Sequence, residues 1–504
     1  MSDKINAYPV YIYNTLTRQK ELFKPLQEGF VGMYVCGPTV YGDPHLGHVR
    51  GGMIFDVIFR YFRHLGYKVR YVRNITDVGH LEDENAGVGE DRIAKKARLE
   101  QVEPMEVAQY YTRSYHQALD KMNFLRPSIE PLASGHIIEQ IELVRTIIDA
   151  GYAYEVKGSV YFDVEKFAKD YPYGQLSGKV LEDLRADTRG TVGQEDKKNS
   201  MDFALWKFAE PEHIMRWPSP WSDGFPGWHA ECTAMSTKYL GNPFDIHGGG
   251  MELKFPHHEA EVAQNMAATG RGPANYWIHN NMLNINGQKM SKSLGNFITM
   301  EQAYSGDHPL LEQAYSPMTI RFFILQNHYR SPVDFGNEPL KAAEKGYQRL
   351  MNALEVAGKI THPGGVEGPG PKDAELEGWI NRVYGELSDD FNTAKAIASI
   401  FEMASVINAL HHGEQSIKSV SPAALEAFAR TFREIVTDVL GFVPELTRDN
   451  RHVEGLVQLL IELRNEARSN KNYALSDKIR DDLAAVGIQL KDERGGGTSF
   501  SIVN

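Results

Sequence analysis

Residues 31–75 constrain the fold more than any other part of the chain. Apolar residues alternate over 31–35, as they do in a half-buried strand. They then recur at helical spacing over 46–65, and Gly66 follows as a typical C-terminal cap. Another extended pattern covers 68–75. Strand, helix and strand in this order predict a right-handed βαβ unit with a parallel sheet, and therefore an α/β fold.

The loop between the first strand and the helix places two histidines, His45 and His48, at the start of the helix. They are spaced i, i+3 and share one face. Gly47 lies between them and would let a flat base or a ribose approach the backbone. In open parallel sheets this position binds nucleotides, because the N–H groups and the dipole of a helix N-terminus attract phosphate. The pattern equally fits two surface histidines at a helix start.

A second motif, far downstream, has two lysines in a polar stretch: Lys289-Met290-Ser291-Lys292-Ser293-Leu294-Gly295-Asn296. Alone, it is typical of a solvated loop. Together with His45-Leu46-Gly47-His48, and in this order, it resembles the signature motifs of the class I aminoacyl-tRNA synthetases. The resemblance implies that four residues are catalytic: His45, His48, Lys289 and Lys292. They would stabilise the attack of an amino-acid carboxylate on the α-phosphate of ATP, a reaction that needs positioning and positive charge.

The chain has two cysteines, Cys36 at the end of the first predicted strand and Cys232 much later. Neither belongs to a CxxC pair, and a lone cysteine is most often a small core residue. His257 and Glu261 are spaced i, i+4 at a predicted helix start, so an imidazole and a carboxylate share one face, as a metal site requires. Spacing alone leaves the core and metal-site interpretations open, and it does not separate His257 from His258.

Five further segments are similar to the cysteinyl-tRNA synthetase family, in the family's order and over nearly the whole chain: 34–41, 73–77, 227–232, 247–250 and 255–261. The resemblance implies one Zn²⁺ per chain, held by Cys36, Cys232, His257 and Glu261, with His258 the less favoured ligand. Zinc prefers a soft thiolate to a hydroxyl, which would separate cysteine from serine.

The same resemblance implies an amino-acid pocket formed by Thr76, Trp228 and His247. It also implies an ATP site, used with Mg²⁺, formed by Thr39, His45, Gly47, His48, Gly248, Gly249 and Lys292. The glycines after the strand would allow a ligand to approach the backbone closely, although an ordinary tight turn has the same sequence.

The 504 residues suffice for about three domains of ~150 residues each. We expect a Rossmann-like parallel-sheet catalytic domain at 1–340, with an inserted connective domain at about 100–200 and the lysine loop and stem-contact region at about 285–340. An α-helical bundle that binds tRNA would follow at 341–445, and a small anticodon-binding module at 446–504. A charge-rich stretch at 82–98 is predicted as an exposed loop leading into a helix, and no role for it follows from the resemblance.

Candidates for reading the anticodon are Arg468, Asp477 and Asp492. Residues 451–504 carry eight Lys/Arg and eight Asp/Glu, so a solvated surface would look the same. The formal net charge of the whole chain is -12, which argues against strong non-specific binding of nucleic acid but allows a local basic stripe.

The family resemblance implies a cysteine–tRNA ligase whose partners are L-cysteine, ATP and tRNA(Cys), and a monomer. Two cysteines argue against a disulfide framework, and no apolar run is long enough for a membrane span, so we expect a cytoplasmic protein without membrane contact. The alternatives are a related ligase that passes activated cysteine to an amino sugar, and an inactive paralogue that binds tRNA or zinc. The helical region after 340 counts against the first, and the intact motifs count against the second.

Overall fold

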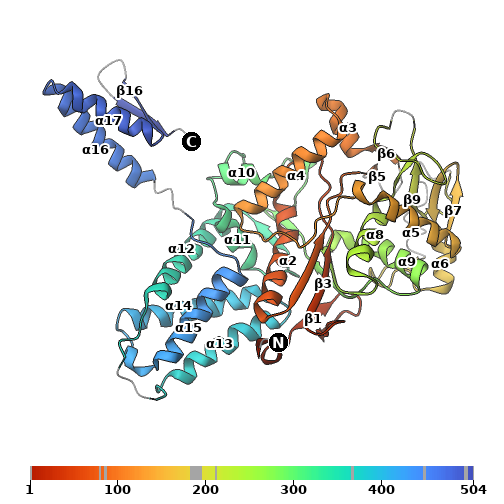
Figure 1. Cartoon of the computed structure of the whole chain (residues 1–504), viewed down its shortest axis with the longest axis horizontal. Helices are drawn as coiled ribbons and strands as arrows, with labels where there is room; N and C mark the ends of the chain where they lie inside the picture. Colours follow the sequence, from red (N-terminus) through yellow and green to blue (C-terminus); the bar gives the residue numbers. More distant parts are fainter. Residues whose placement is uncertain are drawn as a thin grey trace. The chain divides into compact units, whose positions relative to one another are not determined.

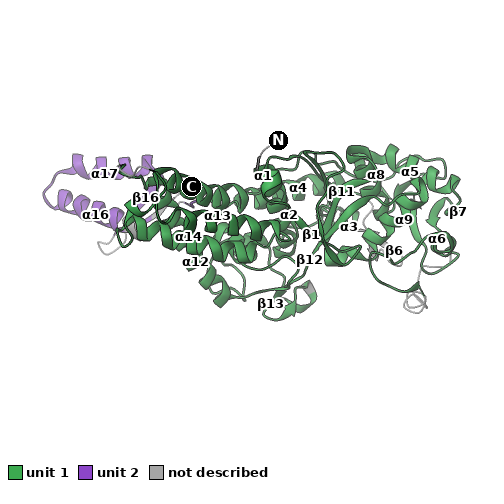
Figure 2. Cartoon of the chain, turned by 90° about the horizontal axis from the view of Figure 1, so that it is seen from below, with its two compact units in different colours: residues 1–443 green, residues 444–504 purple. Residues whose placement is uncertain are grey.

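The computed structural model describes residues 3–78, 81–83, 88–181, 196–210, 213–364, 368–445, 450–492 and 498–502. The chain divides into two compact units, Met1–Val443 and Pro444–Asn504, which are coloured separately in Figure 2. Each unit has its own internal contacts.

A four-stranded parallel sheet with the strand order β12-β11-β3-β4 forms the centre of the first unit. Its strands are β3 (Phe30–Val35), β4 (Lys68–Arg73), β11 (Phe244–Gly250) and β12 (Ala274–Asn280). Helix α2 (Leu46–Leu65) connects β3 to β4 (Figure 1). The helix ends at Gly66, whose φ of 106° is a left-handed conformation that favours glycine. The βαβ unit predicted from the sequence is confirmed.

The two halves of this sheet are separated in sequence by an insertion whose first helices, α3 and α4, pack into the core of the sheet. It begins with β5 (Leu81–Asp83), β6 (Val88–Asp91), α3 (Arg92–Glu100), α4 (Pro104–Lys121), η1 (Ser134–His136) and α5 (Ile137–Asp149). It continues with β7 (Ala153–Val156), β8 (Ser159–Phe162), α6 (Val164–Asp170), β9 (Phe203–Phe208) and β10 (Gly224–Pro226). Strands β10, β9, β8 and β7 make an antiparallel sheet whose core includes Phe162 and Trp206.

The second half of the catalytic fold supplies the helices beside the sheet. These elements are α8 (Trp228–Leu240), η2 (Met251–Lys254), α9 (His257–Thr269), β13 (Leu283–Ile285), β14 (Gln288–Lys289), η3 (Lys292–Leu294), α10 (Met300–Ser305), α11 (Pro317–Leu325) and β15 (Val333–Phe335). A helical bundle follows, with α12 (Asn337–Lys359), α13 (Asp373–Ser388), α14 (Thr393–His411), η4 (Ile417–Ser419), α15 (Pro422–Glu434) and the π-helical turn η5 (Ile435–Val439).

A buried ion-pair network joins the bundle to the sheet layer. Arg321, which is fully buried on α11, places its Nη2 2.5 Å from the Oδ2 of Asp56 on α2. Its Nε donates to the carbonyl of Leu440 just after η5 (2.7 Å), and Asp56 also pairs with Arg60 (2.9 Å). Because each charge has a partner, burial of the network is tolerated.

Helix α14 is the one described helix that is long and apolar enough to cross a membrane. Half of its apolar stretch is buried inside the bundle. A core helix passes the same test of length and composition, so α14 is weak evidence for a membrane span.

The N-terminal elements are α1 (Asp3–Ala7), β1 (Tyr11–Asn14) and β2 (Gln19–Leu22), and β1 and β2 form a hairpin. The partners of β1 lie far along the chain. The backbone N–H of Tyr13 donates to Oδ1 of Asp390 (2.8 Å), and the side chain of Asn14 donates to the carbonyl of Asn275 (2.9 Å). The N-terminal segment therefore contacts both the last strand of the central sheet and the bundle.

The second unit contains α16 (Asn450–Ser469), α17 (Tyr473–Ala485), β16 (Ile488–Asp492) and β17 (Thr498–Ile502). The two strands pair antiparallel, and Val457, Ile461, Leu483 and Ile488 form its small buried core.

Candidate active site and metal centre

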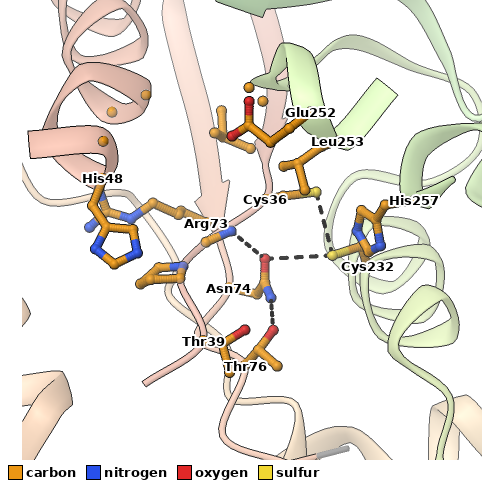
Figure 3. A pocket seen from close by; sticks show the side chains of 18 of the residues that line it. Cys36, Thr39, His48, Arg73, Asn74, Thr76, Cys232, Glu252, Leu253 and His257 are labelled. Atoms are coloured by element: carbon orange, nitrogen blue, oxygen red, sulfur yellow. Dashed lines mark hydrogen bonds between the residues drawn. The ribbon is translucent and has the colours of Figure 1, made fainter. Parts of the chain in front are cut away.

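A cavity of about 280 Å³ lies at the carboxyl ends of β3 and β11, beside the start of α2. Side chains from the segments before and after the insertion line the cavity, as Figure 3 shows for Cys36 and for Cys232. Nine of the residues predicted from the sequence line it: Cys36, Thr39, Gly47, His48, Thr76, Trp228, Cys232, Gly249 and His257. Parallel strands present their carboxyl ends at one edge, which explains why distant parts of the sequence meet here.

Four side chains that could hold a metal meet at this cavity: Cys36, Cys232, His257 and Glu261, whose ligand atoms all lie within 4.8 Å of one another. The Sγ atoms of Cys36 and Cys232 are 3.6 Å apart. The Oε1 of Glu261 is 3.6 Å from the Sγ of Cys36 and 3.2 Å from the Nε2 of His257. Two sulfurs, one nitrogen and one oxygen form a donor set that suits zinc.

Burial raises the pKa of the Cys36 thiol well above its usual value, and the neighbouring Cys232 and Glu261 add to the shift. Burial also raises the pKa of Cys232. A cation would reverse this preference, because a bound metal favours the thiolate. Without a cation both thiols are therefore neutral and poor nucleophiles.

A second group of possible ligands overlaps the first and consists of Cys36, His247, His258 and Glu261. The Nε2 of His258 lies 3.3 Å from the Sγ of Cys36, and its Nδ1 lies 2.8 Å from the Nε2 of His279. His247 and His258 do not line the cavity, whereas Cys36, Cys232 and His257 do. The structure thus brings both adjacent histidines to the cluster, but only His257 faces the open space.

The three residues predicted for the amino-acid pocket surround this cluster in different ways. Thr76 donates its hydroxyl to the buried carboxylate of Glu231 (2.8 Å). Trp228 stacks on His257 with ring centroids 4.2 Å apart. His247 lies behind the cluster, where its Nε2 is 2.9 Å from Oε2 of Glu261 and its ring stacks on a tryptophan of β12. Thr76 and Trp228 line the cavity, and His247 orients a possible metal ligand.

Sequence reasoning missed Asn74, which connects several of these groups. Its Oδ1 accepts from the backbone N–H of Gly37 (2.9 Å), and its Nδ2 donates to Oγ1 of Thr76 (3.1 Å). The Sγ of Cys232 is 3.7 Å from the same Oδ1, as the dashed lines in Figure 3 indicate. Asn74 lies within the 73–77 segment, so its position in a motif was a signal, but nothing in the spacing indicated these partners.

The two histidines of the first motif form a reciprocal cap at the start of α2. The Nδ1 of His45 accepts from the backbone N–H of Gly47 (3.1 Å), and the Nδ1 of His48 accepts from the backbone N–H of His45 (3.4 Å). Their rings stack with centroids 3.8 Å apart. Desolvation lowers the pKa of His48 to about 4, so this imidazole is neutral at pH 7.

The lysine motif lies against the same helix start. The backbone N–H of Met300, just after the motif, donates to the carbonyl of Pro44 (2.8 Å), and Phe297 packs edge-on against His45 at 4.8 Å. Asn296 closes the loop, because its Oδ1 accepts from the N–H of Ser291 (2.8 Å) and its Nδ2 donates to the carbonyl of Lys289 (3.1 Å). The Lys289 side chain is exposed. The backbone of Lys292 lies in η3, and its side chain is outside the described residues.

The two glycines predicted to bind ATP differ in their surroundings. A Cβ on Gly249 would come within 2.8 Å of the His258 ring, and the Gly249 backbone lines the cavity. A Cβ on Gly248 would lie 2.1 Å from the ring of Phe55, and Gly248 is not among the lining residues. Close packing of α2 on β11 therefore accounts for Gly248, whereas Gly249 is open to a ligand.

The candidates for anticodon reading belong to the second unit. Arg468 is exposed near the end of α16. Asp477 is exposed on α17, with its Oδ1 3.6 Å from a guanidinium nitrogen of Arg480. The backbone of Asp492 ends β16, and its side chain lies outside the described residues.

Comparison with known proteins identifies the family and the fold. The family model described as "tRNA synthetases class I (C) catalytic domain" matches residues 22–345, and the model described as "DALR domain" matches 382–444. Among solved structures, a methionyl-tRNA synthetase from Mycobacterium tuberculosis in complex with methionyl-adenylate has a TM-score of 0.56 and 15% identity, covering 82% of this chain and 91% of that chain. A ternary LeuRS–tRNA–LeuAMS complex from Agrobacterium radiobacter has a TM-score of 0.58 and 13% identity, covering 84% and 87%.

At such low identities the structures show the fold alone, and together with the family model they define a class I aminoacyl-tRNA synthetase. The chain is 59% identical over 488 residues to a cysteine–tRNA ligase of Bacteroides thetaiotaomicron, covering 96% of this chain and 97% of the relative. It is 56% identical over 492 residues to that of Porphyromonas gingivalis, covering 97% and 98%. The chain therefore belongs to the cysteine–tRNA ligase family.

Proposed function

We propose that this protein joins L-cysteine to tRNA(Cys) in two ATP-dependent steps. In the first, the carboxylate of cysteine attacks the α-phosphorus of ATP, the bond to the β-phosphate breaks, and cysteinyl-adenylate and pyrophosphate form. In the second, a hydroxyl of the terminal ribose of tRNA attacks the activated carbonyl, and AMP leaves. The observation that carries this proposal is the meeting of two thiols, an imidazole and a carboxylate at a cavity that also contains His48.

In this proposal Cys36, Cys232, His257 and Glu261 hold one zinc ion per chain. This group is preferred to the one with His247 and His258 because its two thiols and His257 line the cavity, where a substrate thiol can reach them. A zinc ion held by these residues would supply a soft Lewis acid that favours a thiolate ligand over a hydroxyl, which would separate cysteine from serine.

The neighbouring side chains orient the amino acid. Thr76 is fixed by Glu231 and Asn74, so its hydroxyl has a defined direction at the cavity wall. Trp228 covers one side and holds His257 by stacking. His247 acts through Glu261, whose second oxygen it contacts.

His45 and His48 contact the phosphates in this proposal. Each ring uses Nδ1 to accept a backbone hydrogen bond, so in the neutral imidazole the proton sits on Nε2. Both rings can then donate from Nε2 to a phosphate oxygen, without a general base in the reaction. Lys289 and Lys292 add positive charge from the lysine loop, and Mg²⁺ accompanies the ATP. Thr39, Gly47 and Gly249 form the wall along which the nucleotide lies.

We assign residues 1–340 to the catalytic domain and the residues after 340 to binding of tRNA. Residues 341–445 form a helical bundle that contacts tRNA, and residues 446–504 form a module that reads the anticodon with Arg468, Asp477 and Asp492. The match of 382–444 to the DALR domain supports the role of the bundle. We further propose a monomer that works in the cytoplasm without membrane contact.

Charging of tRNA with labelled cysteine, with serine as the control amino acid, tests the proposal. The zinc-loaded protein should charge bulk bacterial tRNA with cysteine and not with serine. Transfer of labelled cysteine to an amino sugar, without charging of tRNA, would replace the proposed acceptor. Absence of both reactions would refute the proposed activity.

A further inference from the structure

A second cavity, of about 500 Å³, lies directly beside the first and is covered by helix α3. Both cavities are lined by Thr39, Tyr41 and His48, and the second is also lined by His45. A ligand that occupies the second cavity therefore contacts His45 and also His48, which lines the first cavity as well.

Three cations of α3 line this cavity: Arg92, Lys95 and Lys96. Among the lining residues whose side chains the structure describes, Asp43 is the one carboxylate, and it accepts a hydrogen bond from Ser114 (3.1 Å). This described part of the lining therefore carries more positive than negative charge, in a chain whose formal net charge is -12. Such a local excess concentrates anions in a low-dielectric cleft and is not a property of the surface as a whole.

Two of the three cations are held in place by aromatic rings. The guanidinium of Arg92 donates to the hydroxyl of Tyr41 (3.0 Å) and lies over its ring at 5.4 Å. The ammonium of Lys96 lies 5.8 Å from the ring of Tyr111, which also lines the cavity. Lys96 also pairs with Glu100 (2.8 Å), but both side chains are more than a third exposed, so this pair is weak and can be exchanged for an anionic ligand.

We propose that Arg92, Lys95 and Lys96 of α3 form a phosphate-binding subsite next to His45 and His48, a role that rests on the proposed ligase activity. Phosphate is the anion that both substrates carry to this place. One source is the β- and γ-phosphates of ATP, which leave as pyrophosphate. The other is the backbone of the tRNA 3′ end, which must reach the adenylate in the second step. Arginine and lysine side chains suit either, because they form charge-assisted hydrogen bonds to phosphate oxygens.

The test uses the full-length enzyme with Arg92→Gln, Lys95→Gln and Lys96→Gln, singly and combined. Arg98→Gln is the matched control, because Arg98 lies on the same helix with its side chain exposed and does not line the cavity. Cysteine-dependent ATP–pyrophosphate exchange without tRNA gives KM for ATP and for pyrophosphate. Aminoacylation gives KM for tRNA.

We expect each single change to raise at least one of these KM values roughly tenfold, since a hydrogen bond to a charged group is lost. The KM for cysteine should stay within about twofold, and Lys95→Arg should restore wild-type values because it keeps the charge. A rise for ATP or pyrophosphate assigns the subsite to the nucleotide, and a rise confined to tRNA assigns it to the 3′ end.

Unchanged KM values for ATP, pyrophosphate and tRNA in all single variants, with an active wild type, would overturn the subsite. If the combined variant does not fold, the single variants still decide the question. A wild type that charges no tRNA would refute the proposed function instead. Binding of inorganic pyrophosphate and of a short single-stranded RNA, measured by calorimetry, would then test the subsite alone: weaker binding to the variants supports it, and equal binding overturns it.

Discussion

The Oε1 atom of Glu261 lies 3.6 Å from the Sγ atom of Cys36, although 225 residues separate them in the sequence. Cys36 follows β3 in the first half of the sheet, and Glu261 lies on α9 in the second half. The candidate metal ligands therefore come from both halves of a fold that a large insertion divides. A metal at this place would select the substrate and also fasten the two halves together.

We predict that Cys232→Ser abolishes zinc binding, because a soft thiolate ligand is lost. Zinc content per chain, measured by mass spectrometry after dialysis, should fall from a single ion to almost none. The control is His258→Asn. The asparagine amide takes the place of Nδ1, which contacts His279, but the variant lacks the Nε2 that lies close to Cys36. Retention of zinc by Cys232→Ser and its loss from His258→Asn would favour the ligand group that contains His247 and His258 in place of Cys232 and His257.

Thr76→Val should lower the free energy of unfolding by about 1–3 kcal/mol, because the buried carboxylate of Glu231 loses the hydrogen bond from that hydroxyl. The same change should raise KM for cysteine. Urea unfolding and ATP–pyrophosphate exchange measure the two effects. Thr76→Ser keeps the hydroxyl and should behave like the wild type in both. Equal behaviour of the valine and serine variants would show that the hydroxyl is not used.

His48 should remain neutral from pH 7.5 down to about pH 5, because desolvation lowers its pKa to about 4. Protonation favours the unfolded chain, where the pKa is ordinary, so the contribution of His48 to stability is present at neutral pH and is lost as the pH falls towards 4. Nitrogen NMR of labelled histidines, with the resonance assigned by comparison with His48→Asn, measures this directly. A midpoint near 6.5 would contradict the prediction.

Asn296→Ala should slow activation of cysteine about tenfold through kcat, because Lys289 and Ser291, at the start of the lysine loop, each lose a hydrogen bond to this side chain at its end. The KM for cysteine should not change, since no loop residue whose side chain the structure describes lines the cysteine cavity. Gln288→Ala, an exposed position just before Lys289, is the control. If both variants show the same kcat, Asn296 does not position the loop.

Arg321→Met should destabilise the first unit by about 3–5 kcal/mol, because it removes one of the two guanidinium partners of the buried Asp56 carboxylate and leaves it with Arg60 and the backbone N–H of Leu125. Unfolding by urea, followed by tryptophan fluorescence, measures the loss. Lys359→Met removes an exposed pair with Glu355 and should change stability by no more than about 0.5 kcal/mol. Similar losses in the two variants would mean that the network does not join the sheet and the bundle.

The central part of the fold could be predicted from the sequence because its periodicity is local. The alternation over 31–35, the helical spacing over 46–65 and the cap at Gly66 each depend on neighbouring residues, and all three are present in the structure. The i, i+4 spacing of His257 and Glu261 was likewise a local signal of a shared face, and the structure places both at the cluster.

The remaining features of the site depend on contacts between distant segments. Glu231 lies on helix α8, and a glutamate in a helix is usually exposed. The structure buries it fully against Thr76, which is 155 residues away in sequence. The sequence could not distinguish Gly248, which leaves room for Phe55, from Gly249, which faces the cavity. The charge-rich stretch had no predicted role, because only the fold brings α3 next to His45 and His48.

Strand β1 has a consequence for the order in which the molecule is built. Asn14 hydrogen bonds to the backbone at residues 275 and 277, and the N–H of Tyr13 donates to Asp390. During synthesis the hairpin of β1 and β2 leaves the ribosome long before these partners exist. Since domains fold as their residues emerge, this hairpin must wait for the bundle and is fixed in place late.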